Sequence, residues 1–143
     1  MYHGDLQTKN AMLQNGEPML IDMGEVGFGH PLIDLGHACS AMYTFIGDYE
    51  PVIGMPRETG AELWRRTMRC YFDGLPEAEY AHRMEQIEAA SVIRNFTWLS
   101  LSDSFPEAVV RECRESFGER VAKRKDYLFG VAATFADWTM PGG

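Results

Sequence analysis

The dipeptide Asn15-Gly16 constrains the start of this chain more than any other feature of the sequence. Both residues tolerate the left-handed backbone of a two-residue turn, and short apolar runs flank them at 11–13 and 18–21. The pattern predicts an antiparallel hairpin across residues 11–21, followed by a glycine-rich loop over 22–29. Because a hairpin returns the chain to its starting point, the residues just before and just after it are expected to lie side by side.

Polar residues that suit phosphoryl transfer stand at both ends of this hairpin. Asp5 and Asn10 precede it, and Asp22 follows it directly. Phosphoryl transfer needs a carboxylate that receives the proton of the attacking hydroxyl, and oxygen ligands that hold Mg²⁺ against the nucleotide phosphates. A loop carboxylate, a later amide and a second carboxylate past the hairpin can supply both, so we expect the three side chains to converge.

Three short motifs then give the sequence a resemblance to a known family. The string H-G-D-x-x-x-x-N at residues 3–10, followed by I-D-x-G at 21–24, is similar to the catalytic and metal motifs of aminoglycoside phosphotransferases, choline kinases and related enzymes with a protein-kinase-like fold. The likeness continues through G-x-P-x-x-D-L at 29–35. The order and spacing of the motifs, with a hairpin between them, make the resemblance much more specific than any single piece.

The resemblance implies a role for each polar residue. Asp5 resembles the catalytic base, Asn10 a Mg²⁺ ligand and Asp22 the principal Mg²⁺ ligand. His3 would be a structural residue of the catalytic loop. Asp34 would support that loop without itself contacting the substrate or the metal. The implied cofactors are Mg²⁺ and ATP, and the implied activity is phosphorylation of a small-molecule hydroxyl on an amino sugar, a choline-like molecule or a related compound.

Simpler interpretations of the same residues remain open. An isolated Asp-Asn loop is often only a turn, and an acid at position 34 is often a surface or capping residue of a helix. The histidines at 3, 30 and 37 could be imagined as a transition-metal cluster with nearby acids, but they lack the spacing of known ligand motifs. Packing or loop hydrogen bonding is the better expectation for them.

The predicted fold class is α+β and mostly helical, in a single domain over residues 1–143. Residues 1–35 are expected to carry the catalytic loop, hairpin and metal loop, and residues 36–143 about four helices. The helices are predicted over 31–46, 59–72, 77–100 and 106–128. Their expected buried positions are Leu32, Leu35, Ala38, Cys39 and Met42 in the first, Leu63, Thr67, Cys70 and Tyr71 in the second, and Tyr80, Met84, Ile87 and Ala90 in the third. Capping boxes are predicted at Thr59-x-x-Glu62 and Ser104-x-x-Glu107.

The resemblance also implies parts that this sequence does not show. Kinase-fold enzymes of this type carry an N-terminal ATP-binding lobe, whereas here the catalytic loop begins at the third residue. The expectation is therefore a truncated C-terminal lobe with little or no activity alone, and with exposed apolar faces that favour a homodimer or higher oligomer. The alternatives are a non-catalytic remnant that acts as a self-associating or partner-binding scaffold, and an unrelated helical binding module.

Composition narrows the choice of partners. The net charge of −8 argues against nucleic acid, which requires a basic surface, and is compatible with a cationic small substrate. No apolar run reaches the ~18 residues of a membrane span, and the N-terminus lacks the pattern of a signal peptide, so a cytoplasmic location without membrane contact is expected. Acids and aromatics that could contact a cationic substrate, with core packing the better expectation for each aromatic, are Asp48, Tyr49, Glu50, Trp64, Trp98 and Asp103.

Overall fold

The computed structural model describes residues 1–44, 49–101 and 130–138, together with the single positions 107, 108, 111, 115, 118 and 126. Its described part is mostly helical with one two-stranded antiparallel sheet, which confirms the α+β class. The helices and strands are β1 (Ala11–Gln14), β2 (Glu17–Leu20), α1 (Leu32–Cys39), a π-helical turn (Ser40–Thr44), α2 (Tyr49–Ile53), α3 (Arg57–Tyr71) and α4 (Glu77–Leu101). Short 3₁₀ turns cover Thr8–Asn10, Met23–Glu25 and Phe135–Asp137.

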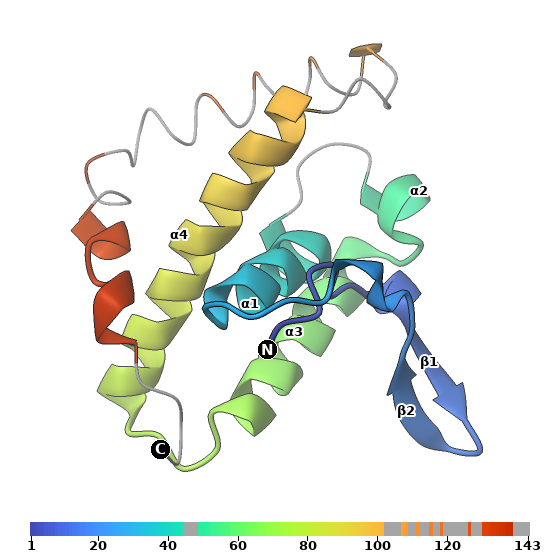
Figure 1. The fold of residues 1–143 in the computed structure, drawn as a ribbon, viewed down its shortest axis with the longest axis horizontal. Coiled ribbons are helices and arrows are strands. Elements are labelled where there is room, and N and C mark those ends of the chain that lie inside the picture. Colours follow the sequence, from blue (N-terminus) through green and yellow to red (C-terminus); the bar gives the residue numbers. More distant parts are fainter. Residues whose placement is uncertain are drawn as a thin grey trace.

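Helices α3 and α4 run in opposite directions and diverge from the turn that joins them, and α1 packs against α4 in the space between the two (Figure 1). The core lies among these three helices. It consists of Leu32, Leu35, Ala38, Cys39, Met42, Trp64, Met68, Phe72, Tyr80 and Ile87. The hairpin projects away from the helical body, and the loops at its base lie against α1 (Figure 1). The helices therefore form a rigid support on which the loops of residues 3–29 rest.

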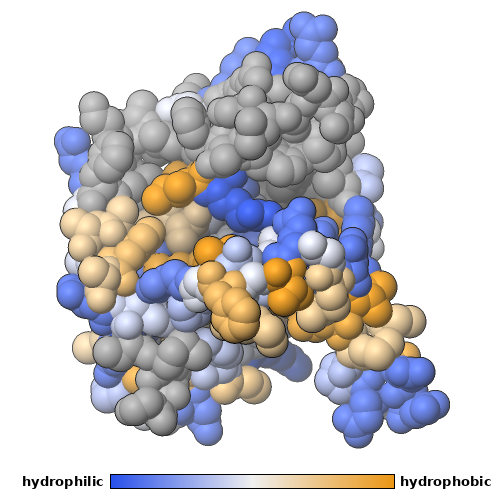
Figure 2. Space-filling view, viewed as in Figure 1, coloured by the Kyte–Doolittle hydropathy of each residue, from blue (hydrophilic) through white to orange (hydrophobic). Residues whose placement is uncertain are grey.

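The hairpin forms as the Asn-Gly signal predicts. Asn15 and Gly16 have φ values of 54° and 84°, and Gln14 pairs with Glu17 across the turn. All eight strand residues are exposed, including Leu13 at 73%. Figure 2 shows a hydrophilic tip and apolar surface nearer the body. A two-stranded hairpin gains little stability by itself, so its attachment to the body must fix its position.

Helix α1 has the predicted buried face but a different end. All five of its expected inward residues are buried. The α-helix does not continue to residue 46: it ends at Cys39 and widens into the π-helical turn, and residues 45–48 lie outside the described part. In the wider turn the Oγ1 of Thr44 lies 2.6 Å from the Oγ of Ser91 on α4, and Ser40 bonds Asn95. These polar pairs between helices are not visible in the apolar periodicity.

The start of α3 was predicted at the wrong residue. The helix begins at Arg57, directly after Pro56, and not at a capping box opened by Thr59. The carboxylate of Glu62 is not available for capping because it pairs with Arg65 and, at 2.7 Å, with Arg66. A proline just before the first turn suits a helix start, since the missing N–H would have no intrahelical partner there.

The prediction of the buried face of α3 was also wrong, by one position. The inward residues are Gly60, Trp64 and Met68, whereas Leu63, Thr67, Cys70 and Tyr71 are exposed. Successive residues on a helix differ by about 100° in direction, so a shift of one residue turns the stripe onto another face. Trp64 is 1% exposed, and its burial gains more apolar area than burial of Leu63 would.

Helix α4 agrees with its prediction in length and direction. It spans Glu77–Leu101 against the expected 77–100. Tyr80 and Ile87 are buried, while Met84 and Ala90 are partly buried against the core. The short helix α2 was not predicted, and the predicted helix over 106–128 falls almost wholly outside the described residues. Among the described helices, none combines the length and apolar character that a bilayer crossing demands.

Candidate active site

The loop of residues 3–10 brings Asp5 and Asn10 into direct contact. The Nδ2 of Asn10 donates to the Oδ2 of Asp5 over 2.7 Å and to the backbone carbonyl of Asp5 over 3.0 Å. The Nε2 of Gln7 donates to the same Oδ2 over 2.8 Å. Because two acceptors face the nitrogen of the Asn10 amide, its oxygen points elsewhere and keeps its lone pairs for another ligand.

The ring of His3 links the loop before the hairpin to the loop after it. Its Nε2 donates to the carbonyl of Ile21 over 2.9 Å, and its Nδ1 accepts the N–H of Asp5 at 3.3 Å. The two bonds are consistent with one neutral tautomer that carries its hydrogen on Nε2. His3 is buried, so it connects the residue before Asp22 with the backbone of Asp5 from beneath both loops.

The carboxylate of Asp34 lies under the start of the same loop. Its Oδ2 accepts the N–H of His3 over 2.7 Å, and its Oδ1 accepts the N–H of Gly4 over 2.8 Å. Gly4 has a φ of +92°, and a Cβ there would lie 2.6 Å from the carbonyl oxygen of Glu25. The loop therefore needs glycine at this position, and it donates two charge-assisted hydrogen bonds to the Asp34 carboxylate in the first turn of α1.

Asp22 reaches this region through the backbone. The N–H of Ile21 donates to the carbonyl of Asn10 over 2.9 Å, which closes the base of the hairpin. Asp22 itself is exposed and has left-handed backbone angles, φ 59° and ψ 59°. The structure thus joins Asp5 and Asn10 directly and places Asp22 one residue beyond the closing bond. The assigned roles of these residues stay predictions.

His37 is a neighbour of Asp5 that the sequence did not single out as a site residue. Its Nε2 lies 3.3 Å from the Oδ1 of Asp5, and its Nδ1 lies 3.2 Å from the carbonyl of Gly4. Burial, and then the positive charge of Arg94, lower the pKa of His37 below its ordinary 6.5, while Gly4, Asp5 and Asp34 act in the opposite direction. A signal did exist, because position 37 follows Asp34 by three residues and shares its helix face.

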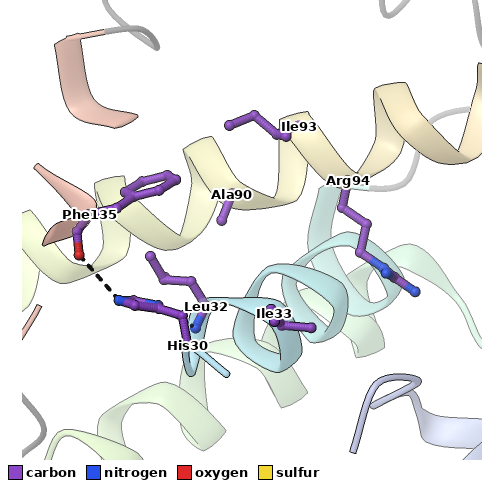
Figure 3. A pocket seen from close by; sticks show the side chains of 7 residues that line it. All are labelled: His30, Leu32, Ile33, Ala90, Ile93, Arg94 and Phe135. Atoms are coloured by element: carbon purple, nitrogen blue, oxygen red, sulfur yellow. Dashed lines mark hydrogen bonds between the residues drawn. The ribbon is translucent and has the colours of Figure 1, made fainter. Parts of the chain in front are cut away.

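A cavity of about 310 Å³ lies between α1, α4 and Phe135 (Figure 3). Its lining is largely apolar, with His30 at one end, where the ring meets the carbonyl of Phe135 at 3.2 Å. Arg94 at the other end donates from Nη2 to the carbonyl of Gly4 over 3.4 Å. Arg94 therefore links the wall of the cavity to the residue before Asp5.

Comparison with known families gives a match for the N-terminal part of the chain. Residues 2–71 match the model of the phosphotransferase enzyme family. The matched segment is similar to that family. The match includes the loop of Asp5 and Asn10, the hairpin, Asp22, Asp34 and α3, which confirms the resemblance to aminoglycoside phosphotransferases and choline kinases. No curated protein and no solved structure matches the chain.

The match to the phosphotransferase enzyme family indicates kinase-like phosphotransfer and, in general, the use of ATP and Mg²⁺. Within the described residues, no group of three or more His, Cys, Asp and Glu side chains is arranged to hold a metal. The predicted ligands are one amide and one carboxylate, which are the oxygen donors that Mg²⁺ prefers alongside water and phosphate. Of the proposed substrate aromatics, Trp64 belongs to the core, and the side chain of Trp98 lies outside the described part.

Proposed function

We propose that this chain carries the catalytic and metal-binding loops of an ATP-dependent small-molecule kinase, within the C-terminal lobe of a protein-kinase-like fold. The single observation that supports this most is the 2.7 Å bond between Asp5 and Asn10, inside a loop of the phosphotransferase-family segment that Asp34 clamps from α1. A simple surface turn does not need a helix carboxylate that accepts two of its backbone N–H groups. The transferred group would go to a hydroxyl of a small molecule.

In the proposed reaction Asp5 is the proton acceptor. The hydroxyl oxygen would attack the terminal phosphorus of ATP while the bond from that phosphorus to the bridging oxygen breaks and ADP leaves. The hydroxyl proton would pass to the carboxylate of Asp5. The Oδ2 of Asp5 accepts bonds from Asn10 and Gln7, which fix the direction of the carboxylate. The side chain is 27% exposed, so a substrate can reach it while most of its surface is shielded from water.

Asn10 and Asp22 are the proposed Mg²⁺ ligands. The amide oxygen of Asn10 faces away from Asp5, as its nitrogen is held by two acceptors, and the carboxylate of Asp22 is exposed. This pair of oxygen donors fits Mg²⁺ better than a transition metal. When bound, the ion would neutralise charge on the nucleotide phosphates. His3 and Asp34 keep the two ligand-bearing loops at a fixed separation.

For the acceptor substrate we propose a small molecule with a hydroxyl and a positive charge, such as an amino sugar or a choline-like compound. The net charge of −8 favours the approach of cations. The site of action would be the cytoplasm, and neither nucleic acid nor a membrane is proposed as a partner. Calorimetry of a cationic and an anionic sugar in the presence of Mg²⁺·ADP separates this substrate class from its opposite.

Titration calorimetry with Mg²⁺ and ADP tests the proposal, and binding is measured because the acceptor substrate is unidentified. The wild-type chain should bind Mg²⁺·ADP, and Asp22→Ala should lose at least about tenfold in affinity, or about 1.4 kcal/mol. Asp73→Ala is the matched control, since Asp73 is an exposed acid at the end of α3. Equal binding by wild type and Asp22→Ala, or no binding by either, would overturn the proposed metal site.

A second candidate function is self-association through the apolar surface around the hairpin. This surface, which we term the hairpin surface, consists of Met12, Leu13, Met19, Leu20, Met23 and Phe28, all of them exposed. Phe28 is 91% exposed, although burial of a Phe side chain typically contributes about 1.5–3 kcal/mol. We propose a homodimer in which two copies cover this surface, as expected for the scaffold alternative.

Light scattering coupled to size-exclusion chromatography tests the second candidate. The wild-type chain should elute as a dimer at micromolar concentration, and the double variant Leu13→Lys, Phe28→Lys should elute as a monomer. Leu63→Lys is the control, because Leu63 is an exposed leucine on α3, away from the hairpin. A monomeric wild type, or a dimer that survives the double substitution, would contradict this interface.

A further inference from the structure

The cavity between α1, α4 and Phe135 has the size and the lining of a binding site for a small molecule (Figure 3). Its volume of about 310 Å³ lies at the lower end of the roughly 300–1,000 Å³ that such sites enclose. The apolar side chains that line it come from three elements: Leu32 and Ile33 from α1, Ala90 and Ile93 from α4, and Phe135 from the last 3₁₀ turn. None of these side chains has a part in the proposed phosphoryl transfer. The cavity therefore suits the apolar body of a separate ligand.

At one end of the cavity, both ring nitrogens of His30 are engaged within the protein. Nδ1 accepts the N–H of Leu32 over 3.1 Å, and Nε2 faces the carbonyl of Phe135 at 3.2 Å. A ring that carries its hydrogen on Nε2 makes both bonds at once. This end therefore leaves no ring nitrogen for a ligand, and the polar contact has to come from the other end.

Arg94 supplies a positive charge at that other end (Figure 3). Its Nη2 donates to the carbonyl of Gly4 over 3.4 Å, which is a long bond to an uncharged acceptor. Among the described residues, no acid lies in ion-pair contact with its guanidinium. A guanidinium presents five N–H donors in a planar fork, so one bond to Gly4 leaves donors for a planar anion such as a carboxylate.

We propose that this cavity binds a small molecule with an apolar body and a single carboxylate: the body lies between Ile33, Ile93 and Phe135, and the carboxylate pairs with Arg94. One guanidinium balances one negative charge, so a monoanion fits better than a dianionic phosphate ester, whose second charge would face a chain of net charge −8. A cation would meet Arg94 with like charge, so this ligand differs in charge from the acceptor substrate proposed above. The inference concerns a second site and does not rest on the proposed function.

Titration of the full chain with phenylbutyrate, followed by amide NMR, tests the site without nucleotide or metal. Phenylbutyrate has an aromatic body and one carboxylate, and phenylbutyramide has nearly the same shape without the charge. The amide signals of Ile33, Ile93 and Phe135 should shift saturably. Phenylbutyrate should bind at least about fivefold more tightly than the amide, since a hydrogen bond to a charged group is the stronger one. Arg94→Met should remove this preference, and Arg66→Met, the same exchange at an exposed arginine of α3, should leave it unchanged.

The apolar part of the site is tested separately by Ile93→Trp, which places a larger side chain at a half-exposed position of the lining. This variant should weaken the binding of both probes by at least about fivefold, whereas Leu63→Trp, at an exposed position of α3, should weaken neither. Four results would each overturn the inference: no saturable shift up to about 10 mM phenylbutyrate, shifts centred away from the cavity, a preference for the acid that is absent or survives Arg94→Met, or unchanged binding by Ile93→Trp.

Discussion

The substitution Asp34→Asn should destabilise the catalytic loop more than any other single exchange of an acid for its amide. Asp34 accepts the N–H of His3 over 2.7 Å and that of Gly4 over 2.8 Å, one on each carboxylate oxygen. Asparagine has one acceptor oxygen, so one backbone N–H would lose its partner and face an NH₂ group. A hydrogen bond to a charged group contributes about 1.5–3 kcal/mol to stability. Since Asp34 is partly exposed, we expect a loss of about 2 kcal/mol from the free energy of unfolding.

Urea denaturation followed by circular dichroism measures this loss. The midpoint should fall while the dependence on urea concentration stays constant, because the surface exposed on unfolding does not change. Asp73→Asn removes one charge from an exposed turn and should stay within about 0.5 kcal/mol of the wild type. A loss below about 0.5 kcal/mol in Asp34→Asn would show that the carboxylate does not hold the loop, and would refute the reasoning.

Three further predictions concern the helices beneath the site. Gly36→Ala should destabilise the protein by about 1–3 kcal/mol in the same assay. A Cβ at position 36 would lie 3.1 Å from the backbone and the Cβ of Ala90, so α4 would have to move. An unchanged or raised urea midpoint would contradict this close packing. The unfolding free energy should fall as the pH drops from 6.5 to the lowered pKa of His37, because in this window the unfolded chain binds more protons than the folded chain. His37→Gln should flatten this slope, and an equal slope in both proteins would count against it. Trp64→Ala should lower the free energy of unfolding by about 3–5 kcal/mol, whereas Leu63→Ala, at the exposed neighbouring position, should lower it by less than about 1 kcal/mol. Chemical denaturation measures both, and similar losses would mean that the buried face of α3 is assigned to the wrong residues.

Features with a strong local cause could be predicted from the sequence. The Asn-Gly turn requires positive φ at both positions, and the hairpin follows from it. Helices α1 and α4 keep their predicted faces because their apolar residues recur at helical spacing without competing stripes. The convergence of the two loops was also predictable, since a hairpin must return the chain to its start.

Features that depend on contacts between different helices or loops could not be predicted from local sequence patterns. In α3 the stripe of Gly60, Trp64 and Met68 competed with one through Leu63. Only the packing of α3 against the π-helical turn and the rest of the core selects the larger aromatic. The π-helical turn depends on polar partners of α4, among them Ser91, far away in the sequence. The contact of His37 with Asp5 similarly depends on where α1 meets the loop. The apolar periodicity of one helix carries no information on its contacts with other elements.

The central claim is that Asn10 and Asp22 hold one divalent ion beside Asp5. Paramagnetic broadening of amide NMR signals by Mn²⁺, added with ADP as a substitute for Mg²⁺, tests it most directly. The account predicts broadening centred on Asn10 and Asp22 that spreads to Asp5, that excess Mg²⁺ reverses, and that Asp22→Ala abolishes. Broadening centred elsewhere, such as on the acids of α4, or broadening that persists in Asp22→Ala, would contradict it.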